Sequence, residues 1–163
     1  MARATPGDAV TTSEVAGLTA LHDSFANILG RWAAAGIQEV IIERAGAGID
    51  PASMTVLNVL MRAGGSARPS HVAQQTGTGA SNVSKVLARM ESRGLVERAT
   101  DEGDQRAVSI TVTVAGRRVH QAVVDTSIAM LGELLHDWSH DDIELFGALL
   151  NRYATALQNT VFG

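Results

Sequence analysis

The stretch SNVSKVLARMESRGLVER, residues 81–98, decides how this chain folds. Its apolar side chains recur at steps of three and four residues, which is the spacing of one buried helix face: Val83, Val86, Leu87 and Met90. Gly94 ends that helix, and the residues after it, 95–98, favour a strand. The stretch therefore predicts an amphipathic helix over about residues 80–93 that is followed directly by a β-strand.

The other face of this helix is unusual for a surface that meets only water. Exposed helix faces usually hold Glu, Lys and Gln, which are strong helix formers. Here the face holds small or hydrogen-bonding residues and two cations: Ser81, Asn82, Ser84, Lys85, Ala88, Arg89 and Ser92. Small side chains let a helix come close to another molecule, while Asn, Ser, Lys and Arg bond to base edges or phosphates. Taken alone, the helix fits a DNA-contacting face and an ordinary surface helix equally well.

Two further helices are expected before this one. Asp50-Pro51 is a strong start signal, because an acidic N-cap precedes proline at the first helical position. That helix is expected to end at Gly64-Gly65, and Pro69 opens a short helix to about Thr76. A tight turn follows at residues 77–79.

A β-hairpin is expected after residue 94. Residues 107–114 alternate between apolar and polar side chains, with Val108, Ile110, Val112 and Val114 on one face, so they pair with 95–98. The polar residues between the strands place Arg106 at the hairpin tip or just beyond it. An arginine there can enter a minor groove, where narrow A·T tracts concentrate negative potential. Asp104 could hold its guanidinium by a charge-assisted hydrogen bond, or form only an ordinary surface ion pair.

The two ends of the chain predict long amphipathic helices. Residues 13–45 form the first, capped by Thr12 or Ser13, and residues 116–160 form the last two, with a capping box at 139–142. Each carries more apolar surface than one small lobe could bury. The expected fold class is mainly α with a small β-hairpin (α+β): a flexible arm at 1–12, a single domain at 13–163, and within it a winged helix–turn–helix lobe at about 51–114.

Charge and composition agree with this assignment. The formal net charge is −4, but residues 62–118 hold nine basic and five acidic residues, whereas both flanking segments are acidic. A basic middle is expected when one face meets phosphates. There is no cysteine, no apolar run long enough to cross a bilayer and no secretory signal, so a cytoplasmic location and no membrane partner are expected.

These motifs together resemble the MarR family of bacterial regulators (multiple antibiotic resistance regulators) over about residues 14–160. Met90 to Val96 match the Leu/Met-Glu-x-x-Gly-Leu-Val pattern that ends the family's recognition helix. The wing and the turn after it also match, at Asp104, Arg106, Thr113 and Gly116. Gln105 departs from the arginine that is common there. Gly79 stands where the family usually has a Ser or Thr cap, so the resemblance implies that Thr78 caps this helix instead.

The resemblance implies a homodimer whose first, fifth and sixth helices interlock, with its lobes in successive major grooves of a pseudo-palindromic operator and its wings in the minor grooves. It implies a transcriptional repressor that a small phenolic or carboxylate ligand releases. The predicted DNA contacts are Ser81, Asn82, Ser84, Lys85, Arg89, Asp104, Arg106 and Arg68. His22, Phe25 and Trp32 could line a ligand pocket, although aromatic residues at helical spacing more often pack in a core.

Other functions fit the sequence less well. His136 and His140 lie near Asp137, Asp141 and Asp142, a set that would suit a metal-responsive regulator, but a new helix expected at Ser139 spoils their geometry. A winged-helix module that binds protein would need an apolar or acidic face at 80–93. No phosphate loop, zinc-protease motif or nucleophile elbow is present, so neither an enzyme nor a cofactor is expected.

Overall fold

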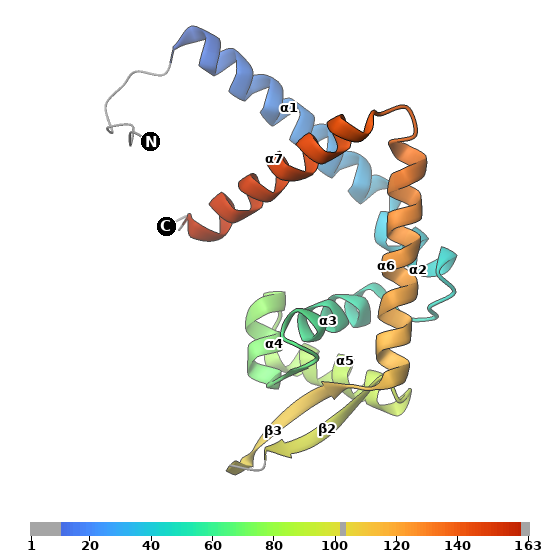
Figure 1. The fold of residues 1–163 in the computed structure, drawn as a ribbon. Coiled ribbons are helices and arrows are strands. Elements are labelled where there is room, and N and C mark those ends of the chain that lie inside the picture. Colours follow the sequence, from blue (N-terminus) through green and yellow to red (C-terminus); the bar gives the residue numbers. More distant parts are fainter. Residues whose placement is uncertain (1–10, 102–103, 161–163) are drawn as a thin grey trace.

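The computed structural model describes residues 11–101 and 104–160, without the side chains of residues 100–107 and 158. Helices α1 (Thr12–Ala35) and α2 (Ile37–Arg44) come first, and helices α6 (Val114–Leu134) and α7 (His140–Asn159) come last. Between them lies the winged lobe, made of α3 (Pro51–Arg62), β1 (Ser66–Ala67), α4 (Pro69–Thr76), α5 (Ala80–Ser92), β2 (Val96–Asp101) and β3 (Asp104–Val112). The mainly helical α+β fold with a winged helix–turn–helix is confirmed (Figure 1).

The core of the molecule lies in this lobe. All the apolar positions that the sequence assigned to the inner face of α5 are buried, with relative exposures of 1–5%: Val83, Val86, Leu87 and Met90. They pack against Leu57 and Leu60 of α3, which are fully buried, and against Ile110 of the sheet. Ile42 of α2 and Val123 of α6 extend the same core, so both helices are anchored to the lobe.

The sheet is three-stranded and antiparallel, in the order β1-β3-β2. Val96 lies opposite Val112 and Arg98 lies opposite Ile110, which confirms the predicted hairpin, although its strands reach further than expected. Ile110 and Val112 are buried, but Val108 is 37% exposed because the hairpin extends past the lobe (Figure 1). The expectation for Val114 is wrong: it begins α6, since the Thr113 side chain accepts a hydrogen bond from the Gly116 amide and caps the helix.

The first long helix differs from its prediction at both ends. It begins after Thr11, whose hydroxyl accepts from the Glu14 amide while the Glu14 carboxylate accepts from the Thr11 amide at 2.7 Å, so Thr12 and Ser13 are not the cap. The hydrogen bonds that the Glu14 carboxylate accepts from the Thr11 amide and hydroxyl hold its pKa below the usual value. Gly36 adopts φ 55° and divides residues 13–45 into α1 and α2. Of the predicted flexible arm, residues 1–10 lie outside the described part of the chain.

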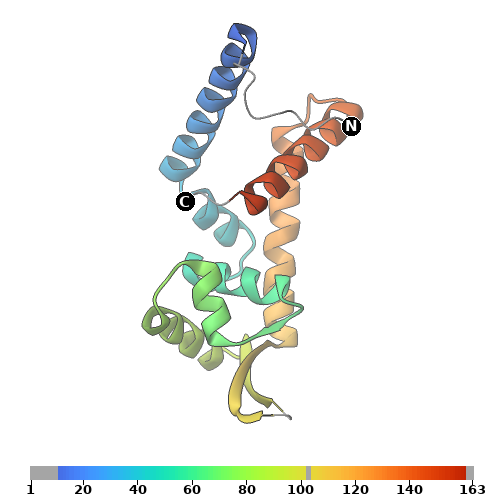
Figure 2. The ribbon, with the colours of Figure 1, turned by 90° about the vertical axis from the view of Figure 1, so that its left-hand side faces the viewer.

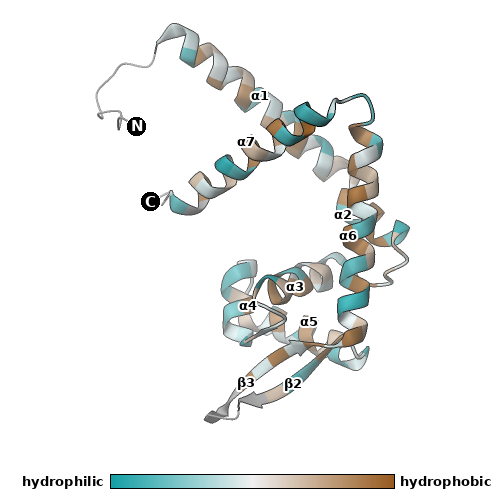
Figure 3. Ribbon diagram, viewed as in Figure 1, coloured by the Kyte–Doolittle hydropathy of each residue, from teal (hydrophilic) through white to brown (hydrophobic). Residues whose placement is uncertain are grey.

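Helix α6 leads from the lobe to a separate group of helices, which we call the helical arm: α1, the second half of α6, and α7 (Figures 1 and 2). Within it, Phe25 of α1 packs on Tyr153 of α7 at a ring distance of 5.0 Å, and Trp138 packs on Phe146 at 5.5 Å. Large apolar side chains remain exposed along all of its helices; on α7 they are Ile143, Leu145, Phe146, Leu149, Leu150, Tyr153 and Leu157. Figure 3 colours the ribbon by hydropathy, and hydrophobic segments (brown) recur along these helices.

Candidate nucleic-acid interface

The first half of α5 presents a bare polar surface. Ser81, Asn82, Ser84 and Lys85 are exposed on it, as the sequence predicts for the face opposite the buried stripe. Gly79 is the N-cap and offers no side chain, while the Thr78 hydroxyl is bonded to that of Thr76 at 2.8 Å. The expectation that Thr78 caps this helix is therefore wrong. Short side chains and an uncapped first turn leave the backbone of this end accessible to a close neighbour.

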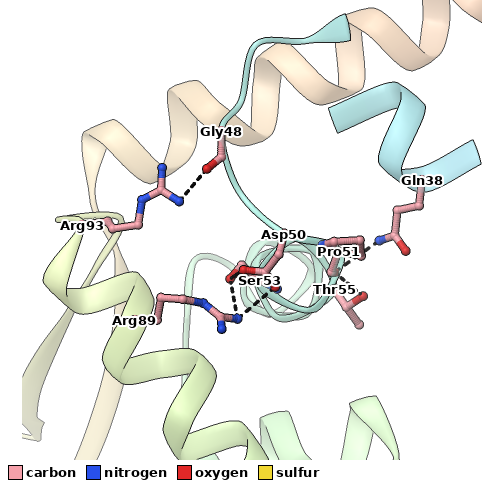
Figure 4. Close-up of polar contacts among 8 residues, drawn as sticks. All are labelled: Gln38, Gly48, Asp50, Pro51, Ser53, Thr55, Arg89 and Arg93. Atoms are coloured by element: carbon pink, nitrogen blue, oxygen red, sulfur yellow. Dashed lines mark hydrogen bonds and ion pairs between the residues drawn. The ribbon is translucent and has the colours of Figure 1, made fainter. Parts of the chain in front are cut away.

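The cations of α5 fall into two groups. Lys85 has no hydrogen bond or ion pair with any residue in the described part of the chain. Arg89 instead donates to Asp50 at 2.9 Å and to the hydroxyl of Ser53 at 3.3 Å (Figure 4). Arg93 donates to the carbonyl oxygen of Gly48 at 2.5 Å (Figure 4). Lys85 is thus available to an external anion, whereas the two arginines hold the C-terminal half of α5 to the start of α3.

Asp50 is the residue to which Arg89 is tied. It caps α3, accepting from the Ser53 amide at 3.0 Å and from the Ser53 hydroxyl at 2.9 Å, and Pro51 follows at the first helical position as expected. Burial raises the pKa of the Asp50 carboxyl, but the hydrogen bonds from Ser53 and the charge of Arg89 outweigh it, so the pKa lies below its usual value. The carboxylate is therefore charged at neutral pH.

The other predicted DNA contacts lie on the wing and at the start of α4. The backbones of Asp104 and Arg106 belong to β3, but their side chains lie outside the described part of the chain. Arg98 of β2 donates to Glu91 of α5 at 3.0 Å, which joins the base of the wing to the helix. Arg68 is exposed at the N-cap of α4. The Arg98–Glu91 ion pair thus links the base of the hairpin directly to α5.

A cavity of about 450 Å³ lies between the end of α1, α2, α3 and α6. Its lining is mostly apolar, with a few polar side chains: Gln38, Asn58 and Ser127. Trp32 lines it, but Phe25 packs on Tyr153 and His22 is exposed beside Asp23, so the structure does not bring the three predicted residues together. The remaining lining residues come from α2, α3 and α6, and no sequence motif marks them.

The acidic corner between α6 and α7 has ordinary surface contacts. His136 pairs with Asp137 and His140 with Glu144, all of them well exposed. Among the described residues, no group of three or more potential ligands could hold a metal ion. No described helix combines the length and the apolar character that a membrane span requires.

Comparisons with known proteins agree with this geometry. Residues 47–107, which cover most of the winged lobe, match a family model described as MarR family. The uncharacterized HTH-type transcriptional regulator YxaD of Bacillus subtilis (strain 168) is 30% identical over 88 residues, which is 54% of this chain and 62% of that protein. The transcriptional regulator HosA of Escherichia coli O111:H- is 32% identical over 74 residues, 45% of this chain and 55% of its own. The match therefore spans little more than half the length of these curated relatives.

A solved structure extends the likeness beyond the lobe. The structure of a MarR family protein from Bacillus stearothermophilus superposes with a TM-score of 0.74, over 92% of this chain and 99% of that chain, at 23% identity. At this level of identity the comparison establishes the fold, and it includes the helical arm as well as the lobe.

Proposed function

We propose that this chain, which belongs to the MarR family, is a transcriptional regulator that binds double-stranded DNA as a homodimer. One observation carries the proposal: the first half of α5 exposes small polar side chains and an unpaired Lys85 beside a projecting hairpin. Its relatives YxaD and HosA are named as transcriptional regulators, and we assign the chain no catalytic role. The proposed location of this DNA binding is the cytoplasm.

Helix α5 enters the major groove in this proposal. Asn82 and Lys85 bond to base edges, because Asn suits adenine and Lys suits guanine, while Ser81 and Ser84 bond to bases or phosphates. Arg106 of the wing enters the neighbouring minor groove with Asp104 orienting it, and Arg68 contacts the backbone. Arg89 is bonded to Asp50 and is treated in the next subsection.

The partner that covers the helical arm is a second copy of the chain. The arm exposes large apolar side chains on every helix, including Leu21 and Trp32 of α1, Leu131 of α6 and Leu149 of α7. Such a contiguous apolar surface is typical of an interface between subunits. A symmetric pair places two copies of α5 on one face of the assembly, which fits a pseudo-palindromic operator.

We propose that a small ligand binds in the cavity between α1, α2, α3 and α6 and regulates DNA binding. The apolar lining and its few polar groups suit a phenol or an aromatic carboxylate. Gln38 lines this cavity and also donates to the carbonyl oxygen of Pro51 at 3.4 Å, next to the α3 cap. We propose that the protein is a repressor, and that ligand binding shifts α3 and releases the operator.

Selection of bound fragments from a random DNA pool tests the proposal with the full chain. We expect enrichment of a palindromic site whose half-sites lie about one helical turn, roughly 10 bp, apart. In gel-shift titrations, affinity for that site falls steeply with added salt through counterion release. A pool that yields no enriched sequence, or an affinity that ignores salt, contradicts the proposal.

Two variants refine the test. Lys85→Ala and Asn82→Ala are each expected to relax the preference at one base pair by about 1–3 kcal/mol, because each removes a base-edge contact. Arg152→Ala is the charge-matched control for Lys85→Ala, since it removes an exposed cation from α7 in the helical arm. Equal weakening on every sequence would assign Lys85 to a phosphate instead of a base.

A further inference from the structure

Arg89 is placed on the polar side of α5 but is not directed outward. Its guanidinium is turned toward the start of α3, where it bonds to the Asp50 carboxylate and the Ser53 hydroxyl (Figure 4). Both acceptors come from a segment distant in sequence, since Asp50 lies 39 positions before Arg89. We call Asp50, Ser53 and Arg89 the α3–α5 clamp.

We propose that Asp50 and Arg89 are positioning residues, which fix α5 at the angle that lets its first turns enter the major groove, and that Arg89 itself makes no contact with DNA. The inference rests on the DNA-binding function proposed above. The sequence places Arg89 on the polar face of α5 and suggests that it contacts DNA, whereas the inference gives it a role within the protein.

The clamp is fixed firmly to the core. Ser53 is 2% exposed, and its hydroxyl donates to Asp50 while accepting from Arg89. Asp50 is held independently by the Ser53 amide at 3.0 Å, as the cap of α3. A charged acceptor that is already oriented gives a stronger and more directional hydrogen bond than one that must be ordered by the contact itself. Arg89 therefore meets a preformed site on α3.

Two other contacts restrict the same half of α5. Arg93 bonds to Gly48 in the loop before α3, and Glu91 accepts from Arg98 of the wing. The C-terminal half of α5 is thus held to α3, to the preceding loop and to β2. The half that carries Asn82 and Lys85 is held by Val83 and Val86, which are buried in the core. The clamp acts one turn further along, where it fixes the orientation in which this half is presented.

Removing the charge of Asp50 distinguishes the positioning role from a direct contact with DNA, because the two roles predict opposite changes in DNA affinity. If Arg89 bound phosphate, Asp50 would compete for it, and Asp50→Asn would tighten DNA binding. If Arg89 positions α5, Asp50→Asn loosens the helix and weakens binding. Asparagine is as good an N-cap as aspartate, so the variant keeps the start of α3 and folds.

The experiment measures Asp50→Asn, Arg89→Ala and the double variant against the selected site and against unrelated DNA. Each single change is expected to weaken binding to the selected site by roughly fivefold, because the ion pair is partly exposed, at 47% for Arg89 and 39% for Asp50, and is screened by solvent. The double variant is expected to be no weaker than the worse single variant, because both remove the same contact. Affinity for unrelated DNA stays unchanged, whereas simple loss of folded protein would lower both affinities together.

Salt dependence supplies the matched comparison. Arg68→Ala, at the residue proposed to contact the DNA backbone, is expected to reduce the slope of log affinity against log salt by about one, and Arg89→Ala is expected to leave that slope unchanged. Tighter or unchanged binding by Asp50→Asn, or a loss of slope in Arg89→Ala, overturns the inference.

Amide hydrogen exchange, measured without DNA, tests the positioning role independently of the proposed function. Faster exchange along α5 in Asp50→Asn than in the parent protein supports the positioning role, and identical exchange overturns it. If the parent protein enriches no DNA sequence, the proposed function fails on its own, whatever the exchange experiment shows of the clamp.

Discussion

Replacing Leu149 by alanine tests whether a second copy covers the helical arm. Leu149 is 49% exposed on α7, so about half of its side chain is left for a partner to bury. The change removes a group whose full burial is worth about 2.4 kcal/mol, at about 0.8 kcal/mol per carbon. The accessible half is worth about 1.2 kcal/mol per chain and about 2.4 kcal/mol in a symmetric pair. The dissociation constant of the dimer should therefore rise about 60-fold.

Sedimentation equilibrium over a dilution series measures that constant directly. Asn151→Ala serves as the control, because Asn151 is an exposed polar residue on the same helix and its loss should leave association unchanged. Far-ultraviolet circular dichroism at the same concentrations establishes that both variants keep their helices. Equal dissociation constants for the two variants, or a parent protein that stays monomeric at every concentration, would refute the reasoning.

Three other outcomes are expected. Arg106→Ala should weaken operator binding in a gel-shift titration while sedimentation still shows a dimer, because only the wing loses its minor-groove contact; undiminished affinity would remove Arg106 from the interface. Gly116→Ala should destabilise the protein in urea by about 1–3 kcal/mol, since an added Cβ would overlap the carbonyl oxygen of Leu95, whereas Gly132→Ala, which meets no neighbour, should not; equal stabilities would argue against the close approach. The stability advantage of the parent protein over Asp50→Asn should be complete at neutral pH and above the ordinary Asp pKa of 3.8, and should vanish as the pH falls through the lowered folded-state pKa; an advantage that persists in stronger acid would show that it does not come from the carboxylate charge.

The parts of the fold that follow local rules could be predicted from sequence. The spacing of Val83, Val86, Leu87 and Met90 located the buried face of α5, and all of them are in the core. Asp50-Pro51 located the start of α3, because capping and proline placement depend on a few adjacent residues. The bare face of α5 follows from the same periodicity, since the side chains that are not buried must point away from the core.

The errors arise where a local pattern continues past the point at which the chain turns. Apolar spacing runs on across Gly36 into α2, so periodicity alone could not reveal the left-handed residue that separates the two helices. The alternation of β3 likewise runs on to Val114, although Thr113 has already capped the next helix. The left-handed backbone of Gly36 in the first case, and the side-chain cap of Thr113 in the second, override the pattern of side chains around them.

The direction of Arg89 could not be predicted for a different reason. A helical wheel places it on the polar flank of α5, which is correct, but its partner lies on another helix. Pairing between distant segments depends on how the helices pack, and that packing could not be inferred from a single sequence. The cavity between α2, α3 and α6 was missed for the same cause, because its lining is gathered from several elements.

The lobe has its own core, whereas the arm has exposed apolar faces. The effects of mutations in these two parts should therefore depend differently on protein concentration. A cavity made at Leu60 weakens the lobe within each chain, so producing more protein does not change the fraction that is folded. If a second copy covers the arm as proposed, a substitution at Leu149 weakens association, and by the law of mass action a higher protein concentration offsets that loss. Mutations of equal thermodynamic severity should therefore differ in cells: those in the lobe lower the folded fraction equally at every level of expression, and those in the arm have less effect on the dimer fraction as the protein becomes more abundant.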